Sequence, residues 1–136
     1  MAERSDSEFS AGGVVVRGGD CIVIVPTRRA ADGSRVLALP KGHPDGDESP
    51  ADAARREVRE ETGVGGRLVR ELDDDHYTDR KGRPKRVRWW LMQPIALDMR
   101  EPDDEVDEVR WVPLADAREL LSYAHDRALV ADLGDA

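Results

Sequence analysis

The stretch from residue 50 to residue 62 carries start and stop signals for one helix, and this helix constrains the rest of the fold. Ser49 is a favourable N-cap, Pro50 suits the first helical position, and Gly63 is a natural C-terminal stop. At ~100° per residue, three apolar side chains fall on one stripe of the helix: Ala51, Ala54 and Val58. A helix with such a stripe has to pack against another element.

The flanking sequence supplies strands on both sides of this helix. Residues 9–17 and 21–29 are apolar, rich in β-branched side chains and separated by Gly-Gly-Asp, which predicts a β-hairpin. Further strands are expected over residues 36–40, 66–72, 75–79, 86–97 and 109–113, and helices over residues 114–123 and 125–133. Three further residues are expected in the core: Cys21, Trp111 and Leu120.

Because strands and helices are interleaved, we expect an α/β fold, with helices on both faces of a mixed β-sheet. No repeat or low-complexity linker divides the chain of 136 residues. We therefore expect a flexible N-terminus over residues 1–8 and a single domain over residues 9–136.

The charge balance narrows the possible partners. The formal net charge is -8, which argues against a general binder of nucleic-acid polymers or anionic membranes but not against a small anionic substrate. The single cysteine allows no intrachain disulfide and fits a reducing compartment. No apolar stretch is long enough for a signal peptide or a membrane span. We expect a cytoplasmic protein, and the sequence leaves its oligomeric state open.

Three glutamates in the second half of the helix break two local rules. Glu57, Glu60 and Glu61 fall within an arc of about 100° beside the apolar stripe, where like charges repel each other. Glu60 and Glu61 also lie in the last turn, where the helix dipole disfavours anions. A solvated charged face is one explanation. The other is a bound divalent cation, and carboxylate oxygens favour Mg²⁺ or Mn²⁺ over zinc.

The residues around these glutamates favour the cation. Residues 42–64 resemble the Nudix box, the signature of the Nudix hydrolase family, at each specified position: Gly42, Glu48, Arg56, Glu57, Val58, Glu60, Glu61, Gly63 and Val64. The resemblance implies a Nudix-type α/β/α sandwich from about residue 9 to residue 133. It also implies hydrolysis of a nucleoside diphosphate linked to another moiety, with Mg²⁺ or Mn²⁺ as cofactor. Metal ions suit this reaction because they neutralise pyrophosphate charge and acidify a bound water.

The resemblance also implies roles for individual residues of the box. Glu60 and Glu61 would be metal ligands, and Glu57 would be either a ligand or the general base. The backbone carbonyl of Lys41 is a further candidate ligand. Arg56 is expected to pair with Glu60 at i,i+4 and to steady the catalytic cluster.

Two acids outside the helix complete the predicted catalytic and metal residues. Glu48 is expected to tie the loop to the helix. Relatives of this family often recruit one more glutamate from a late loop, for which Glu105 and Glu108 are the candidates. Glu105 is favoured because its position, six residues before Trp111, resembles that of the late glutamate of some relatives.

Pro-Lys-Gly-His at residues 40–43 resembles the branch of the family that cleaves dinucleoside polyphosphates. Lys41 and His43 could contact phosphates. Residues 80–88 hold six basic side chains, among them Lys85 and Arg86, which could grip an extended polyphosphate or could simply be a solvated turn.

Aromatic side chains offer stacking surfaces for a base. Tyr77 and Trp90 are the candidates, with Arg28 as a further contact to phosphate or base. Because side chains alternate along a strand, Trp89 and Trp90 should point to opposite faces, so at most one would meet the substrate.

The expected function is hydrolysis of a phosphoanhydride bond in nucleoside polyphosphates, such as diadenosine tetraphosphate. ADP-ribose, an oxidised nucleoside triphosphate and a diphosphoinositol polyphosphate remain alternative substrates. A non-catalytic nucleotide sensor is a second class, which the intact glutamates disfavour. An RNA-binding or cap-removing protein is a third, which the net charge of -8 disfavours.

Overall fold

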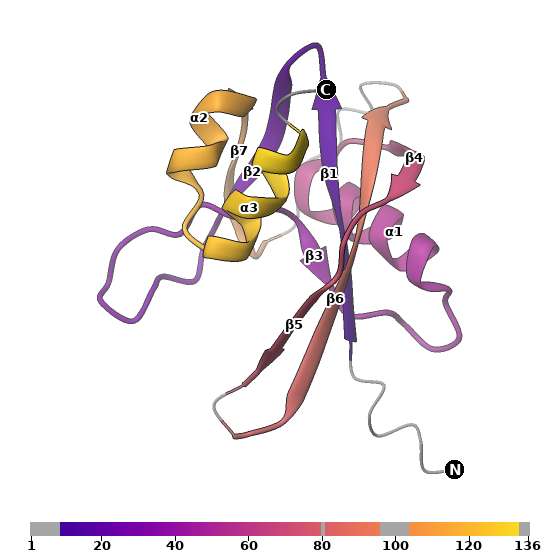
Figure 1. Ribbon diagram of the computed structural model, residues 1–136, viewed down its shortest axis with the longest axis vertical. Helices are drawn as coiled ribbons and strands as arrows, with labels where there is room; N and C mark the ends of the chain where they lie inside the picture. The colour runs from indigo at the N-terminus through magenta and orange to yellow at the C-terminus, as the bar shows by residue number, and fades with distance from the viewer. Residues whose placement is uncertain (1–8, 80, 96–103, 134–136) are drawn as a thin grey trace.

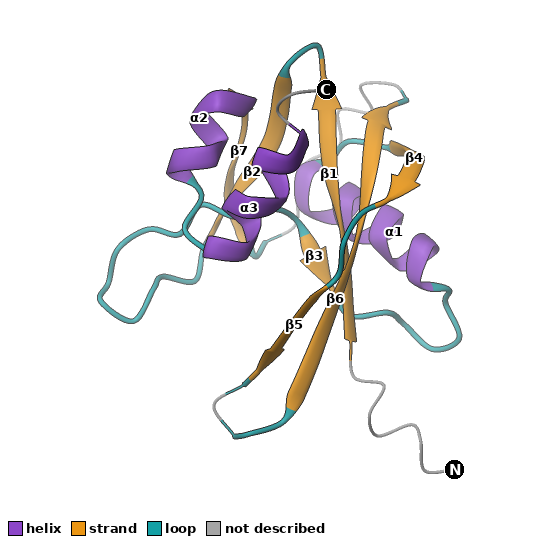
Figure 2. Ribbon diagram, viewed as in Figure 1, coloured by secondary structure: helices purple, strands orange, loops and turns teal. Residues whose placement is uncertain are grey.

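The computed structural model describes residues 9–79, 81–95 and 104–133. In chain order (Figure 1 and Figure 2), its strands and helices are β1 (Phe9–Arg17), β2 (Asp20–Pro26), β3 (Lys41–Gly42), α1 (Pro50–Thr62), β4 (Gly66–Glu71), β5 (Asp75–Thr78), β6 (Pro84–Pro94), β7 (Val106–Pro113), α2 (Leu114–Leu120) and α3 (Ala124–Leu133). The expected flexible N-terminus over residues 1–8 lies outside the described residues. Within the described ranges, no helix is long and apolar enough to cross a membrane.

The strands form one mixed sheet, as the alternation of elements predicts. Its main order is β4-β6-β1-β2-β7, with β3 added beside β1 and β5 beside β6. β1 and β6 run parallel from the pair Phe9–Arg86 to the pair Val15–Met92, and the other pairings are antiparallel. Parallel pairing of β1 with β6 needs a long crossover, and α1 lies on it.

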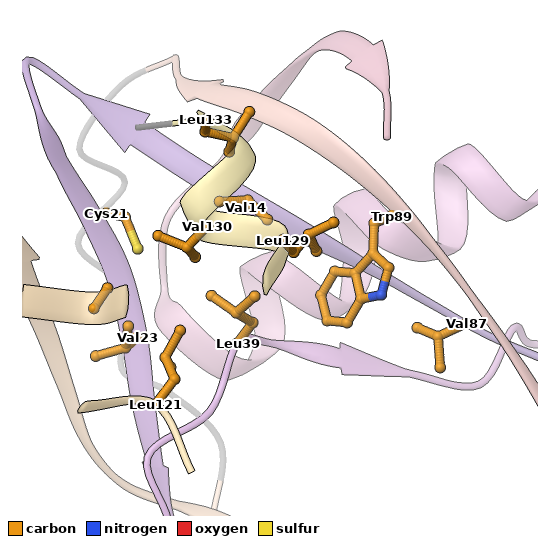
Figure 3. Close-up of a cluster of buried hydrophobic side chains, with 11 residues drawn as sticks. Val14, Cys21, Val23, Leu39, Val87, Trp89, Leu121, Leu129, Val130 and Leu133 are labelled. Carbon is orange, nitrogen blue, oxygen red and sulfur yellow. The ribbon is translucent and has the colours of Figure 1, made fainter. Parts of the chain in front are cut away.

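Helices cover both faces of the sheet, which confirms the predicted sandwich. On one face, α1 packs through Ala54 and Val58 onto a cluster that includes Trp90 and Met92. On the other face, α2 and α3 pack onto a second cluster that includes Trp89 (Figure 3). The two neighbouring tryptophans of β6 therefore belong to different cores, as strand alternation predicts.

The predicted bounds of α1 are confirmed. The Ser49 hydroxyl accepts a hydrogen bond from the Asp52 amide at 3.1 Å, and Gly63 ends the helix with a φ of 78°. The buried face differs slightly from the predicted stripe, because Ala53 is buried and Ala51 is only half-buried.

The sheet opens along the edge of β1 that faces β2. β1 pairs with β2 only near its C-terminal end, where Val16 faces Cys21. Closer to its start, the same edge of β1 pairs with β3. β2 instead meets the chain before β3 at a bridge between Ile24 and Ala38. Residues 36–42 therefore lie inside the opening, where they form one bridge and a short strand rather than the predicted strand over residues 36–40.

The core assignment of Leu120 is wrong. Leu120 is 54% exposed, whereas Leu121 is 1% exposed. The reason is that α2 ends at Leu120 and the backbone of Leu121 is extended, which turns the next side chain inward. Cys21 is buried as predicted, and burial raises the pKa of its thiol to about 12, which makes it an inert core residue.

Candidate metal and nucleotide site

A cavity of about 900 Å³ lies where the sheet opens between β1 and β2. Most of its walls come from the end of β2, β3 and the following loop, the second half of α1, and the residues at the start of β7, and Ser10 and Tyr123 complete the lining. Many of the predicted site residues line it: Arg28, Lys41, His43, Arg56, Glu57, Glu60, Glu61 and Glu105. Four segments far apart in the sequence thus meet in one depression.

Arg56 connects the loop of the box to the acids of α1. Its Nε and Nη2 donate to the two carboxylate oxygens of Glu48 at 2.8 and 3.0 Å, a bidentate pair. Nη2 also donates to the His43 carbonyl at 2.8 Å, and Nη1 donates to Glu57 at 3.2 Å and to Glu60 at 3.1 Å. The guanidinium lowers the pKa of Glu48 below its usual value. Glu48 therefore stays charged and acts behind the cavity, whose lining it does not join.

Glu57 is more buried than its neighbours Glu48 and Glu60 in the cluster. Its side chain is 12% exposed, and burial is the main cause that raises its pKa above the usual value. The charge of Glu60 also raises this pKa, while Arg56 opposes the shift. Glu57 occupies space that Gly42 leaves free, because a Cβ at Gly42 would lie 2.2 Å from the Glu57 carboxyl carbon.

Glu61 joins α1 to β3. One of its carboxylate oxygens accepts a hydrogen bond from the Lys41 backbone amide at 3.1 Å. The contact seen at Lys41 therefore runs through its N–H group, whereas the sequence pointed to its carbonyl as a metal ligand.

The donor chemistry of the site fits a hard divalent cation, because Glu57, Glu60, Glu61 and Glu105 offer only oxygen ligands to one cavity. In the described part of the chain, no three His, Cys, Asp or Glu side chains lie close enough to hold a metal ion as they stand. Arg56 instead supplies the positive charge between Glu57 and Glu60. The guanidinium contacts Glu57 through Oε2 and Glu60 through Oε1, so a bound cation would share these carboxylates with Arg56.

The two candidates for the late acid lie in different surroundings. Glu105 lines the cavity, and its backbone carbonyl accepts a hydrogen bond from the Thr27 amide at 2.9 Å. Glu108 lies within β7 opposite Val25, pairs with Arg110 at 2.8 Å and does not line the cavity. This geometry favours Glu105, as does the spacing in the sequence.

The basic side chains of the β5–β6 hairpin lie outside the cavity lining. Figure 1 shows the hairpin extending away from α1. Four of its described cations are engaged in ion pairs: Arg83 and Lys85 with Asp79, Arg86 with Asp74, and Arg88 with Glu71. Residue 80 lies outside the described residues. These ion pairs favour the interpretation of the hairpin as a solvated turn over that of a polyphosphate-binding surface.

The two predicted stacking residues are also outside the cavity lining. Trp90 is 7% exposed and packs in the core under α1, so its ring offers no open face for a base. Tyr77 is exposed on β5, opposite Lys85. We therefore leave Trp90 out of the proposed substrate contacts.

The profile of the NUDIX domain matches residues 8–133. The chain belongs to the Nudix family. The match spans both faces of the sandwich and includes each acid of the cavity.

Curated relatives of this Nudix chain carry different substrate names. A putative mutator protein MutT4 of Mycobacterium tuberculosis is 36% identical over 97% of this chain and 56% of its own length. An 8-oxo-(d)GTP phosphatase of Mycolicibacterium smegmatis is 39% identical over 68% of this chain and 28% of its own length. A bis(5'-nucleosyl)-tetraphosphatase (asymmetrical) of Caenorhabditis elegans is 33% identical over 67% of this chain and 68% of its own length. This chain thus spans about half or less of the first two relatives.

A solved structure agrees with the Nudix fold. The NUDIX hydrolase from Nitrosomonas europaea superposes with a TM-score of 0.81, at 20% sequence identity, over 94% of this chain and 88% of that one. At this identity the likeness concerns the fold alone.

One residue of the Nudix cavity escaped the sequence analysis. Tyr123 lies between α2 and α3, is 40% exposed and lines the cavity. Its hydroxyl accepts a hydrogen bond from Arg28 Nη2 at 3.2 Å. No pattern in the sequence marks this tyrosine, because its partner is 95 residues away.

Proposed function

We propose that this chain is a metal-dependent Nudix hydrolase that cleaves a phosphoanhydride bond in nucleoside polyphosphates. The observation that carries the proposal is the shared cavity, which is lined by the three glutamates of α1, by Glu105, and by Lys41 and Arg28. One depression thus holds carboxylates that can bind a metal ion and basic side chains that can bind phosphate groups. Mg²⁺ or Mn²⁺ is the proposed cofactor, and the cytoplasm is the proposed location.

The bound cation would neutralise phosphate charge and lower the pKa of a water molecule. Glu60 and Glu61 would hold it, and Glu105, which lines the same cavity immediately before β7, would be a further ligand. Glu57 is suited to accept a proton, because burial and the charge of Glu60 already raise its pKa. Arg56, held by Glu48 through two hydrogen bonds, keeps the second half of α1 aligned with the loop.

Among substrates we propose a dinucleoside polyphosphate such as diadenosine tetraphosphate. The relative named bis(5'-nucleosyl)-tetraphosphatase supports this choice. The exposed ring of Tyr123 adds a stacking surface for a base, and Lys41, His43 and Arg28 add polar contacts along the cavity. The relative named 8-oxo-(d)GTP phosphatase supports an oxidised nucleoside triphosphate as a second candidate.

The test is a substrate panel with Mg²⁺, resolved by chromatography of the products. It contains diadenosine tetraphosphate, 8-oxo-dGTP, ADP-ribose, a diphosphoinositol polyphosphate and ordinary nucleoside triphosphates. We expect diadenosine tetraphosphate to give the highest kcat/KM. A clear preference for 8-oxo-dGTP would select the second candidate, and no metal-dependent turnover of any member would overturn the proposed activity.

Variants of Tyr123 test the stacking surface. Tyr123→Ala should raise KM roughly 10-fold or more, because stacking of one base on an aromatic ring contributes ~1–3 kcal/mol. Tyr123→Phe keeps the ring but loses the hydrogen bond with Arg28, so it should stay near the parental KM. Tyr77→Ala removes an exposed ring outside the cavity and serves as the control. A KM that rises only in the Tyr77 variant would move the stacking surface to β5.

A further inference from the structure

Asp107 occupies an irregular position at the start of β7. Val25 pairs with Glu108 and Pro26 pairs with Val106, so Asp107 is the extra residue of a β-bulge between them. A bulge bends its strand and redirects a side chain. The redirected carboxylate contacts two residues of the chain that follows β2, which Figure 1 shows swinging out beside the sheet.

Both oxygens of Asp107 are engaged by these contacts. Oδ1 accepts a hydrogen bond from the Thr27 hydroxyl at 2.6 Å, and Oδ2 accepts one from Arg35 Nη2 at 2.6 Å. Asp107 does not line the cavity. We call Thr27, Arg35 and Asp107 the clasp.

The clasp holds the backbone that carries Glu105. The Thr27 amide donates to the Glu105 carbonyl at 2.9 Å, and the Thr27 hydroxyl lies 3.4 Å from the Asp104 carbonyl oxygen. Beneath these bonds, Val106 packs with Ile24, Val36 and Ala38 in a small apolar cluster. Thr27 therefore joins the Asp107 carboxylate to the main chain of Glu105, which lines the same cavity as the helix glutamates.

We propose that Asp107, acting through Thr27 and Arg35, is a positioning residue that sets the Glu105 carboxylate at the rim of the cavity and thereby strengthens binding of the divalent cation. The inference rests on the proposed function, in which Glu105 is a ligand. Ligand carboxylates in metal sites are held by hydrogen-bonded neighbours whose removal weakens the metal. Because the Arg35–Asp107 pair is solvent-exposed, its loss should affect global stability little.

The experiment measures Mn²⁺ binding to the full chain without nucleotide, by electron paramagnetic resonance of the free ion. Asp107→Ala and Thr27→Val should each weaken binding roughly tenfold or more. Thr27→Ser keeps the hydroxyl and should bind as the parent does. Glu71→Gln is the matched control, because Glu71 is also an exposed acid paired with an arginine but lies on β4, outside the cavity. Melting temperatures without metal check that each variant is folded.

A double variant separates positioning from a general effect. If Asp107 acts through Glu105, combining Asp107→Ala with Glu105→Gln should weaken Mn²⁺ binding no further than Glu105→Gln alone. Additive losses, or parental Mn²⁺ affinity in a folded Asp107→Ala protein, would overturn the inference.

The same measurement distinguishes the inference from the proposed function. Glu60→Gln should abolish most of the Mn²⁺ binding if α1 holds the cation. Loss in Glu60→Gln with no loss in Glu105→Gln removes the role of Glu105 and the clasp with it, but keeps the metal site of the helix. Parental binding in Glu60→Gln would overturn the proposed metal site itself.

Discussion

Gly42 leaves room for Glu57, a largely buried acid of the site. An added Cβ at this position would lie 2.2 Å from the carboxyl carbon of Glu57. The clashing atoms belong to the far end of a flexible side chain, so Glu57 can turn away without disturbing the backbone. The φ of Gly42 lies outside the left-handed region, so the backbone conformation does not require glycine here. Glycine is needed because the Glu57 carboxylate fills the space that a Cβ would occupy.

This geometry predicts that Gly42→Ala separates activity from stability. We expect a loss of kcat/KM of roughly 100-fold, because a displacement of about 1 Å at a catalytic group can cost that factor. The melting temperature should change little. Gly65→Ala is the control, because a Cβ there meets no heavy atom within 4 Å. Equal activity of the two variants would show that the placement of Glu57 does not limit turnover.

At the scale of elements, α1 and the β5–β6 hairpin contrast in how their charges are used. In α1, repelling acids face a shared cavity, and one arginine joins Glu57 and Glu60 to the loop. In the hairpin, four of the described cations have an acidic partner close by in sequence or across the strands. Negative charge is therefore in excess on the cavity side of α1, whereas most charges of the hairpin are paired.

The hairpin pairing leads to a prediction about substrate affinity. Neutralising Lys85 and Arg86 together to Ala should leave the KM for diadenosine tetraphosphate within about twofold of the parent, because neither side chain lines the cavity. Arg28→Ala should raise this KM, since Arg28 lines the cavity. Steady-state kinetics on substrates of increasing phosphate length are the measurement. A KM that rises with phosphate length in the double variant would restore the hairpin to the substrate site.

At the scale of the whole molecule, a buried acid links the last helix to the chain that leads into the site. Asp126 on α3 is 3% exposed, and its Oδ2 accepts a hydrogen bond from the Leu39 amide at 3.3 Å. Burial raises its pKa from 3.8 to about 6, against the opposing effects of the Leu39 amide, Lys41 and His125, while Asp75 adds to the rise. The carboxylate is therefore a cost to the folded state near neutral pH.

The sign of the resulting pH dependence can be stated. Between pH 3.8 and about 6 the folded state holds the Asp126 proton more tightly than the unfolded chain does, so this group lowers the free energy of unfolding as the pH rises. The pKa difference corresponds to about 3 kcal/mol at most. Asp126→Asn should therefore be more stable than the parent above pH 6, and the advantage should shrink toward pH 4. Urea unfolding across this range measures it, and an advantage independent of pH would contradict it.

Local patterns in the sequence predicted the bounds of α1, the mixed sheet and the grouping of the helix glutamates. These features depend on interactions between residues a few positions apart. Caps set helix ends, a period of about two marks strands, and a helix brings positions i, i+3 and i+4 to one side. The family resemblance also rests on a short stretch, residues 42–64. The profile match over residues 8–133 confirms the family.

The tertiary structure decided what this stretch faces. That β1 changes its partner from β3 to β2, that Trp90 is buried under α1, and that Tyr123 meets Arg28 depend on pairing between residues far apart in the chain. These long-range contacts depend on how the side chains of two hydrophobic cores pack on the two faces of the sheet. The local alternation of apolar and polar residues does not specify them. The sequence by itself determined which acids gather on α1, while long-range packing determined the cavity into which they point.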